Sequence, residues 1–102
     1  MITIIERDTV NAVDAFRVTV GTTAAAIAAS FYPCKRGVGL KAAAGNAGTI
    51  YIGPSDVTAG ATAATDGWPL AAGDELFLPL DDPRAVYAIA SVANQQLHVV
   101  LV

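Results

Sequence analysis

The chain has 102 residues, of which 54% are hydrophobic and only 15% are charged. This length suffices for one core-forming domain, so we expect residues 1–102 to form a single domain. Because alanine supplies much of the apolar content, its core should consist of many small side chains and few large ones. The net charge of −3 provides no basic stripe for phosphates, which argues against binding to nucleic acid or to anionic membranes.

The sequence gives no sign of export or of a membrane span. The first eight residues lack the basic start and the long apolar run of a signal peptide. No stretch approaches the ~18 consecutive apolar residues of a transmembrane helix. The single cysteine, Cys34, has no partner for an intrachain disulfide. No oxidising compartment is implied, and we expect the chain to be made in a cytoplasm.

The N-terminal region predicts an apolar arm followed by a regular strand. Ile2, Ile4 and Ile5 form a short apolar run that is closed by charged residues, so residues 1–8 are expected to be an edge strand or an assembly arm. Residues 15–20 alternate strictly, which predicts a strand with one apolar face. Residues 24–30 are rich in alanine but too short for a stable isolated helix. Strand, irregular structure and a single helical turn all remain open for that segment.

The middle of the chain predicts two strands and an exposed loop. Residues 38–42 alternate between apolar residues and Gly or Lys, which is typical of a half-buried strand. Residues 49–52 are β-branched or aromatic and lie between glycines, which is the clearest strand signal. Residues 58–67 are small and polar, so we expect an exposed, mobile loop there.

The C-terminal third predicts three further strands. Leu76, Leu78 and Leu80 share one face, and residues 81–84 form a turn. Residues 86–91 predict the next strand, residues 93–96 a hairpin turn, and residues 97–102 a final strand. Such a strand would invite pairing by another chain if it were left at an edge. Short strands with turn signals every 8–12 residues predict an all-β fold, either an antiparallel β-sandwich or a jelly-roll-like barrel.

Few residues suggest catalysis or metal binding. His98 is the only histidine, and the alternation of the last strand places it on the side facing solvent or an interface. Asp81 and Asp82 precede Pro83, where Asx residues usually initiate turns rather than form an acid–base pair. Cys34 next to basic residues is a candidate for a low-pKa thiol, but a passive cysteine is the commoner case. We expect no enzyme, no cofactor and no metal.

A glycine pattern in residues 37–42 imitates a nucleotide-binding motif. Its spelling, Gly-x-Gly-x-x-Ala, fits the dinucleotide fingerprint, but that fingerprint requires a helix to follow. Gly45, Asn46 and Gly48 would end such a helix at once. Strand glycines that permit close packing explain the pattern better.

Trp68 is the one tryptophan and has two interpretations. Tryptophan is enriched at interface anchors, so Trp68 joins the isoleucines of the arm as a candidate interface residue. Tryptophan is also highly buried on average. We therefore favour the interpretation that Trp68 is buried and closes one end of the sandwich.

Three segments in a fixed order carry a resemblance to known proteins. They are residues 36–42 (RGVGLKA), residues 48–58 (GTIYIGPSDVT) and residues 67–75 (GWPLAAGDE), and the run from Asp82 to Ser91 fits the same pattern. This order resembles small virion proteins of tailed bacteriophages, including capsid decoration (cement) proteins and related head or tail accessory proteins. The resemblance covers residues 36–102, about two thirds of the chain.

The resemblance implies a non-enzymatic β-sandwich that works as a homo-oligomer, either a dimer or a trimer. Its leading implication is a decoration protein on the capsid surface of the virion, which bridges and stabilises major capsid subunits. The alternative is a head-fibre, tail or baseplate accessory domain that binds another virion protein or a host glycan, with residues 58–67 and Trp68 as the recognition surface. The apolar arm suits strand addition to a neighbour's open edge.

Deleting residues 1–5 tests the assembly role expected for the arm. We expect the truncated chain to assemble less well while its melting temperature changes little, because an arm contributes contacts to a neighbour rather than to its own core. Light scattering and thermal denaturation measure the two effects. A collapse of the melting temperature would mean that these residues belong to the core.

Overall fold

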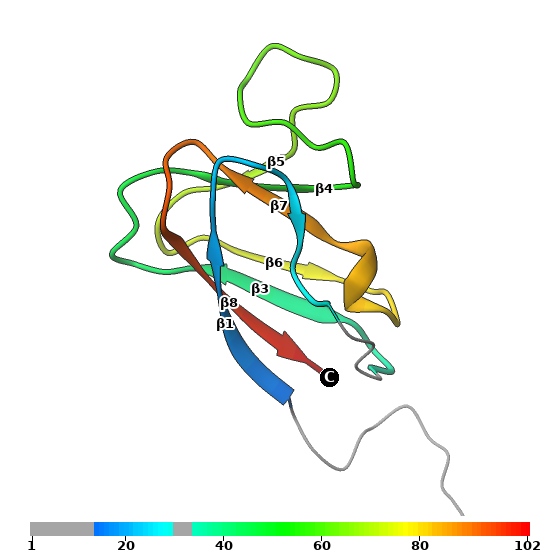
Figure 1. The fold of residues 1–102 in the computed structure, drawn as a ribbon. Helices are drawn as coiled ribbons and strands as arrows, with labels where there is room; N and C mark the ends of the chain where they lie inside the picture. The colour runs from blue at the N-terminus through cyan, green and yellow to red at the C-terminus, as the bar shows by residue number, and fades with distance from the viewer. Residues whose placement is uncertain (1–13, 30–33) are drawn as a thin grey trace, which may run out of the picture.

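The computed structural model describes residues 14–29 and 34–102, which form two antiparallel sheets of four strands packed face to face (Figure 1). The first sheet has the strand order β1 (Asp14–Val20), β8 (Gln95–Leu101), β3 (Val38–Ala42) and β6 (Glu75–Leu78). The second sheet has the order β2 (Ala25–Ala26), β7 (Tyr87–Ala90), β4 (Ile50–Gly53) and β5 (Trp68–Leu70). The expected β-sandwich is confirmed, and neither sheet closes into a barrel.

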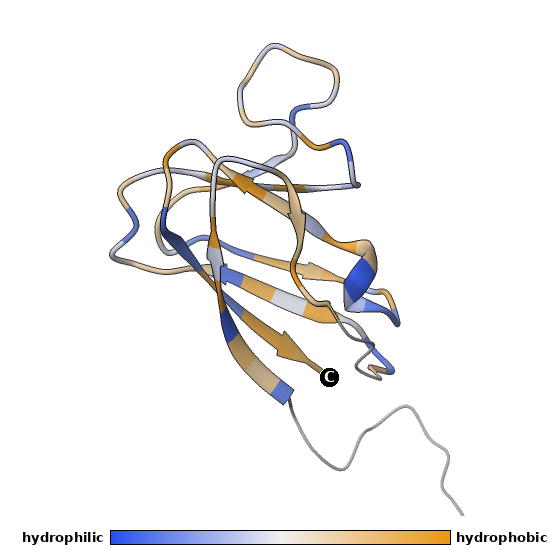
Figure 2. Cartoon of the chain, in the orientation of Figure 1, coloured by the Kyte–Doolittle hydropathy of each residue, from blue (hydrophilic) through white to orange (hydrophobic). Residues whose placement is uncertain are grey.

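The alternation in sequence sets which side chains enter the core. Figure 2 shows hydrophobic residues alternating with more polar ones along β3, as expected for strands with one buried face. Leu97, Val99 and Leu101 on β8 are at most 2% exposed, and Ile50 on β4 is fully buried. Alanines on β3 and β7 fill the remaining space, so the core consists of many small and aliphatic side chains, and no described aromatic side chain is buried in it.

Strand β8 lies inside the first sheet and not at its edge, so the open terminal edge considered from the sequence is absent from the described chain. It pairs with β1 along all seven of its residues and with β3 along five. The strand is protected on both sides within the described part of the chain. The edges of the first sheet are β1 and β6, and those of the second are β2 and β5.

The expected hairpin turn at residues 93–96 is wrong, because β7 and β8 belong to different sheets. Gln95 and Gln96 extend β8 instead. Asn46 explains this extension, since its side-chain carbonyl accepts from the Gln96 N–H at 2.9 Å and its amide donates to the Gln96 carbonyl at 2.9 Å. The buried Gln95 carboxamide accepts from the Gly48 N–H at 2.8 Å and donates to the Ala93 carbonyl at 2.9 Å. These bonds tie the connection between β3 and β4 to the start of β8.

The structure resolves the segment that the sequence left open. Of residues 24–30, only Ala25 and Ala26 form a strand, and the other described residues are irregular. The turn expected at residues 81–84 leads into a 3-10 helix (η1, Pro83–Ala85), which the Asp82 carboxylate caps by accepting from the Arg84 N–H. The glycine-rich segment at 37–42 is strand β3, followed by a turn rather than a helix, so the dinucleotide-binding interpretation is excluded.

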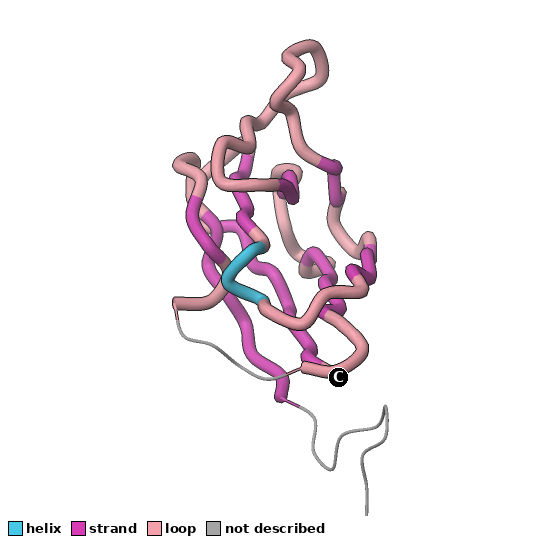
Figure 3. Tube along the Cα trace, turned by 90° about the vertical axis from the view of Figure 1, so that its right-hand side faces the viewer, coloured by secondary structure: helices cyan, strands magenta, loops and turns pink. Residues whose placement is uncertain are grey.

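The expected loop at residues 58–67 projects from one end of the sandwich in both views (Figures 1 and 3). Its base is closed by hydrogen bonds from the Thr58 N–H to the Thr65 carbonyl and from the Gly67 N–H to the Thr58 carbonyl. The exposure expected for this loop is confirmed along residues 61–65. The isoleucines Ile2, Ile4 and Ile5 of the expected arm lie outside the described residues.

Substituting Gly67 by alanine tests the close packing at the base of the loop. A Cβ atom at this position would lie 2.5 Å from Cγ2 of Val57 and 2.7 Å from the carbonyl oxygen of Ile52. Backbone cannot yield as a flexible side chain can, so we expect a loss of about 1–3 kcal/mol in the free energy of unfolding. Urea denaturation measures this loss.

Gly45→Ala is the matched control, because nothing lies within 4 Å of a Cβ at that position. We expect it to leave the free energy of unfolding unchanged or slightly increased, since alanine reduces the entropy of the unfolded chain. Equal effects of the two substitutions would contradict the packing described at Gly67.

Candidate functional site

Cys34, the candidate reactive thiol, has a structural role in the fold. Cys34 is buried, and its thiol donates to the Leu80 carbonyl at 3.4 Å. Burial raises the pKa of the Cys34 thiol, and the nearby negative charges of Asp81 and Asp82 raise it further. The thiolate is therefore disfavoured at neutral pH, so the low-pKa alternative is wrong and the passive interpretation holds.

The neighbouring Asp82 acts as a turn residue. The Asp82 carboxylate accepts from the Arg84 backbone N–H at 3.0 Å and pairs with the Arg84 guanidinium at 2.9 Å. The hydrogen bonds from Arg84 lower the pKa of Asp82. This arrangement caps η1 and leaves Asp82 paired to a cation. Within residues 14–29 and 34–102, no cluster of three or more His, Cys, Asp or Glu side chains is placed to hold a metal ion.

His98 is exposed on β8, on the side opposite Leu97, Val99 and Leu101, as the alternation predicts. The register places it beside Arg17 on β1 and Lys41 on β3. Cationic side chains flank it on both sides, and an imidazole in that setting lacks the carboxylate that orients a catalytic histidine. His98 is thus a surface residue of the first sheet.

Trp68 does not plug the sandwich, which corrects the favoured interpretation. It lies on the edge strand β5 and is 62% exposed. Its register opposite Ile52, a core residue, places it on the core-facing side of the second sheet. At an edge this side is open, because no further strand covers it in the described chain. The indole therefore flanks the opening between the two sheets.

An apolar groove of about 310 Å³ lies along this opening, between the edge strands β5 and β6. We call it the β5–β6 groove, and its main side chains are those of Ile52, Trp68, Leu76, Leu78, Leu80 and Val86. The three leucines share one face, as the sequence predicts, and pack against the core while remaining only partly buried. The groove is therefore a place where the core reaches the surface.

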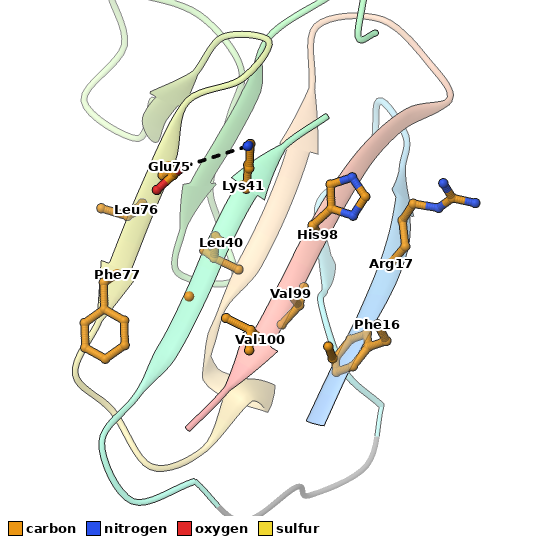
Figure 4. A pocket seen from close by; sticks show the side chains of 12 residues that line it. Phe16, Arg17, Leu40, Lys41, Glu75, Leu76, Phe77, His98, Val99 and Val100 are labelled. Carbon is orange, nitrogen blue, oxygen red and sulfur yellow. Dashed lines mark ion pairs between the residues drawn. The ribbon is translucent and has the colours of Figure 1, made fainter. Parts of the chain in front are cut away.

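The outer face of the first sheet is the second exposed surface (Figure 4). The register aligns the polar side chains of Arg17, His98, Lys41 and Glu75 in one row across the four strands. The adjacent row contains Ala15, Val100, Gly39 and Phe77. A shallow, open depression of about 960 Å³ covers this face. We call these two rows the outer face.

Phe77 is 51% exposed on β6, and sequence reasoning overlooked it. The signal was present, because alternation that turns the leucines on both sides of Phe77 inward must turn Phe77 outward. Its ring lies against Gly37, the residue before β3, and Gly39 on β3: a Cβ on Gly37 would lie 2.6 Å from Cζ of Phe77, and one on Gly39 would lie 4.0 Å from Cδ1. The glycines thus leave room for the aromatic ring on this face.

Asp66 organises the projecting loop. Its carboxylate accepts from the Thr58 hydroxyl at 2.7 Å and from the N–H groups of Thr62 and Ala63 at 2.8 Å each. The hydrogen bonds from Thr58 and the Ala63 backbone lower the pKa of Asp66. The loop beside Trp68 therefore has a defined internal structure that depends on one ionised carboxylate.

Comparison with known proteins adds no family assignment: no family model matches the chain, and no curated protein or solved structure matches it either. None of the helical segments in the described chain is long and apolar enough to cross a membrane. The candidate sites therefore rest on the geometry above, namely the groove with Trp68, the outer face, and the loop.

Acidification tests the role of Asp66. A carboxyl whose pKa is lowered by folding stabilises the folded loop above its ordinary pKa, and this stabilisation is lost as the pH falls through the lowered value. We expect the amide protons of Thr62 and Ala63 to lose protection in that acidic range, and to lose it at neutral pH in Asp66→Ala. Hydrogen exchange followed by NMR measures both effects.

Asp56→Ala is the control, because Asp56 is exposed in the preceding turn and its carboxylate accepts no hydrogen bond from the described loop. It should leave the exchange of Thr62 and Ala63 unchanged. Protection that persists in Asp66→Ala would show that other contacts hold the loop.

Proposed function

We propose that this chain is a non-enzymatic structural protein of a tailed-phage particle, most specifically a decoration protein that bridges major capsid subunits on the capsid surface. The motif order of residues 36–102 supports the phage class. The structural roles of Cys34, Asp66 and Asp82 support a non-enzymatic function, because each of these groups is engaged within the fold.

The observation that carries the proposal is the exposure of Trp68 beside the β5–β6 groove. Protein interfaces concentrate binding energy in a few aromatic side chains next to apolar pockets. The partly buried leucines of the groove surround Trp68 with a continuous apolar surface. The surface therefore suits another protein chain better than a small polar ligand.

Repetition on a particle makes modest contacts effective. Each copy on a capsid meets equivalent subunits, and every contact after the first forms at a high effective concentration. A small domain with few charges and a flat outer face meets this requirement, because weak adhesion at many positions reinforces the whole shell.

Cryo-electron microscopy of the particle that contains this chain tests the proposed position. We expect density for the sandwich on the outer surface of the capsid, in contact with more than one major capsid subunit. Density confined to the tail, the baseplate or the interior would overturn the decoration role.

The second candidate function is a fibre, tail or baseplate domain that binds a host glycan. The exposed indole of Trp68 favours it specifically, because it lies at the base of the projecting loop and aromatic rings pack against sugar faces. Glycan-array binding that disappears in Trp68→Ala would support this function. An absence of binding across the array would remove it in favour of a protein partner.

Trp68→Ala also tests the adhesion surface directly. We expect the variant to keep its melting temperature, because the side chain is largely exposed. Its dissociation constant for capsids lacking the chain should rise at least about tenfold, since an anchor aromatic contributes about 2 kcal/mol or more. Co-sedimentation with such capsids measures the change.

Val92→Ala is the matched control, because Val92 is 44% exposed on the connection between β7 and β8. It should bind as the unmodified chain does. Equal binding of Trp68→Ala and the unmodified chain would contradict a role for the groove.

A further inference from the structure

The outer face of the first sheet carries opposite charges at its two sides. The polar row begins with Arg17 on the edge strand β1 and ends with Glu75 on the edge strand β6. Figure 4 shows these side chains extending from the outermost strands. Glu75 pairs with Lys41 at 3.8 Å, and both side chains of this pair remain more than half exposed. Arg17 has no carboxylate partner in the described chain.

The adjacent row alternates between small and large side chains. Ala15 on β1 and Gly39 on β3 are small, whereas Val100 on β8 and Phe77 on β6 are large. The space over Gly39 is filled from within the chain, since a Cβ there would lie 2.7 Å from Cγ1 of Val100. The row therefore presents one low position, Ala15, and a large exposed ring, Phe77, at its two ends.

From these two rows we infer that the outer face is a homodimer interface, in which two copies of this chain stack about a twofold axis parallel to the strands. Such an axis, placed midway across the sheet, lays β1 of one copy over β6 of the other and β8 over β3. Rotation about this axis leaves the position along the strands unchanged, so each residue faces a residue of the same row in the second copy.

This stacking matches both rows of the face with themselves. Arg17 faces Glu75 of the second copy, and the symmetry repeats the pair at the opposite side. In the apolar row, Phe77 faces the small Ala15 of the second copy, so the exposed ring meets a low position. Val100 faces Gly39 of the second copy, over which that copy's own Val100 lies, so the centre of the row is an aliphatic contact. The central polar pair, His98 with Lys41, adds no attraction of opposite charges.

The alternative twofold axis, perpendicular to the strands, fails on the same residues. When it runs along the polar row, it sets Arg17 against Arg17 and Glu75 against Glu75. When it runs between the rows, it sets Glu75 against Phe77 and leaves Arg17 against Ala15. Contacts are mutual in any twofold dimer, so the charges of the facing residues separate the two axes. Only the parallel axis sets Arg17 against Glu75, and it also agrees with the aligned packing of stacked sheets.

The contact is small, so the dimer is a weak one. Four strands about 4.8 Å apart, with about five residues each, present roughly 300 Å², whereas stable complexes bury about 800 Å² on each side. A contact of this size becomes occupied when many copies are held close together, as on a shell. The inference deepens the proposed structural role by naming the second copy as one of its partners, and its test does not require a capsid.

Charge reversal on the full chain tests the pairing. In Arg17→Glu, both pairs across the axis become Glu with Glu, and in Glu75→Arg both become Arg with Arg. We expect the dissociation constant for self-association to rise about tenfold in each variant, because two exposed ion pairs change from attraction to repulsion. Sedimentation equilibrium up to millimolar concentration measures it.

Mixing the two variants provides the decisive arm of this experiment. A dimer of one Arg17→Glu chain with one Glu75→Arg chain has Glu facing Arg in one pair and the natural Arg facing Glu in the other. We therefore expect the equimolar mixture to associate as well as the unmodified chain. Asp56→Arg, which changes charge by the same amount away from the face, is the control and should associate normally.

Four results would overturn the inference: an unmodified chain that stays monomeric at every concentration, an unmodified chain that forms a trimer, variants that associate as well as the unmodified chain, or a mixture that associates no better than its components. A chain that stays monomeric but binds capsids would contradict the homodimer and leave the decoration role standing. A chain that forms the dimer but does not bind capsids would contradict the decoration role and leave the homodimer standing.

Discussion

The register of β8 against β1 and β3 is the constraint on which the rest of the molecule depends. Because β8 pairs along both sides, its alternation divides the first sheet into a core side with Leu97, Val99 and Leu101 and an outer side with His98 and Val100. A slip of one residue would exchange the two sides. Asn46 fixes the start of this register through its paired hydrogen bonds with the Gln96 backbone.

The composition of the core goes together with the exposure of large aromatic side chains. Alanine and aliphatic residues fill the space between the sheets, and the described aromatic side chains are left at edges and outer faces. Trp68 and Phe77 both lie on edge strands, where a sheet ends and an exposed side chain can meet another chain. Edge strands are sites at which proteins either prevent or use contact with others. The proposed function uses them.

The alternation of apolar and polar residues predicted the sandwich and the buried face of each strand. Successive side chains of a strand point to opposite faces, so a strand with one buried face has an apolar residue at every second position, as in Phe16, Val18 and Val20 or in the leucines of β6. Strand order was not predictable in this way. The connection before Gln95 crosses between sheets, and only the distant Asn46 shows why the strand begins there. Trp68 was misplaced for a related reason: average burial says nothing about a residue whose strand happens to end the sheet. Pro69 concealed β5, although an edge strand tolerates a missing N–H group.

The emission of the one tryptophan tests the central claim, which is that the molecule works through an exposed anchor at the opening between its sheets. The dilute chain should emit at the long wavelength of a water-exposed indole and be quenched efficiently by acrylamide. Binding to its particle should shift the emission to shorter wavelength and protect the indole from the quencher. A short-wavelength, protected emission in the dilute chain, unchanged on binding, would contradict the account.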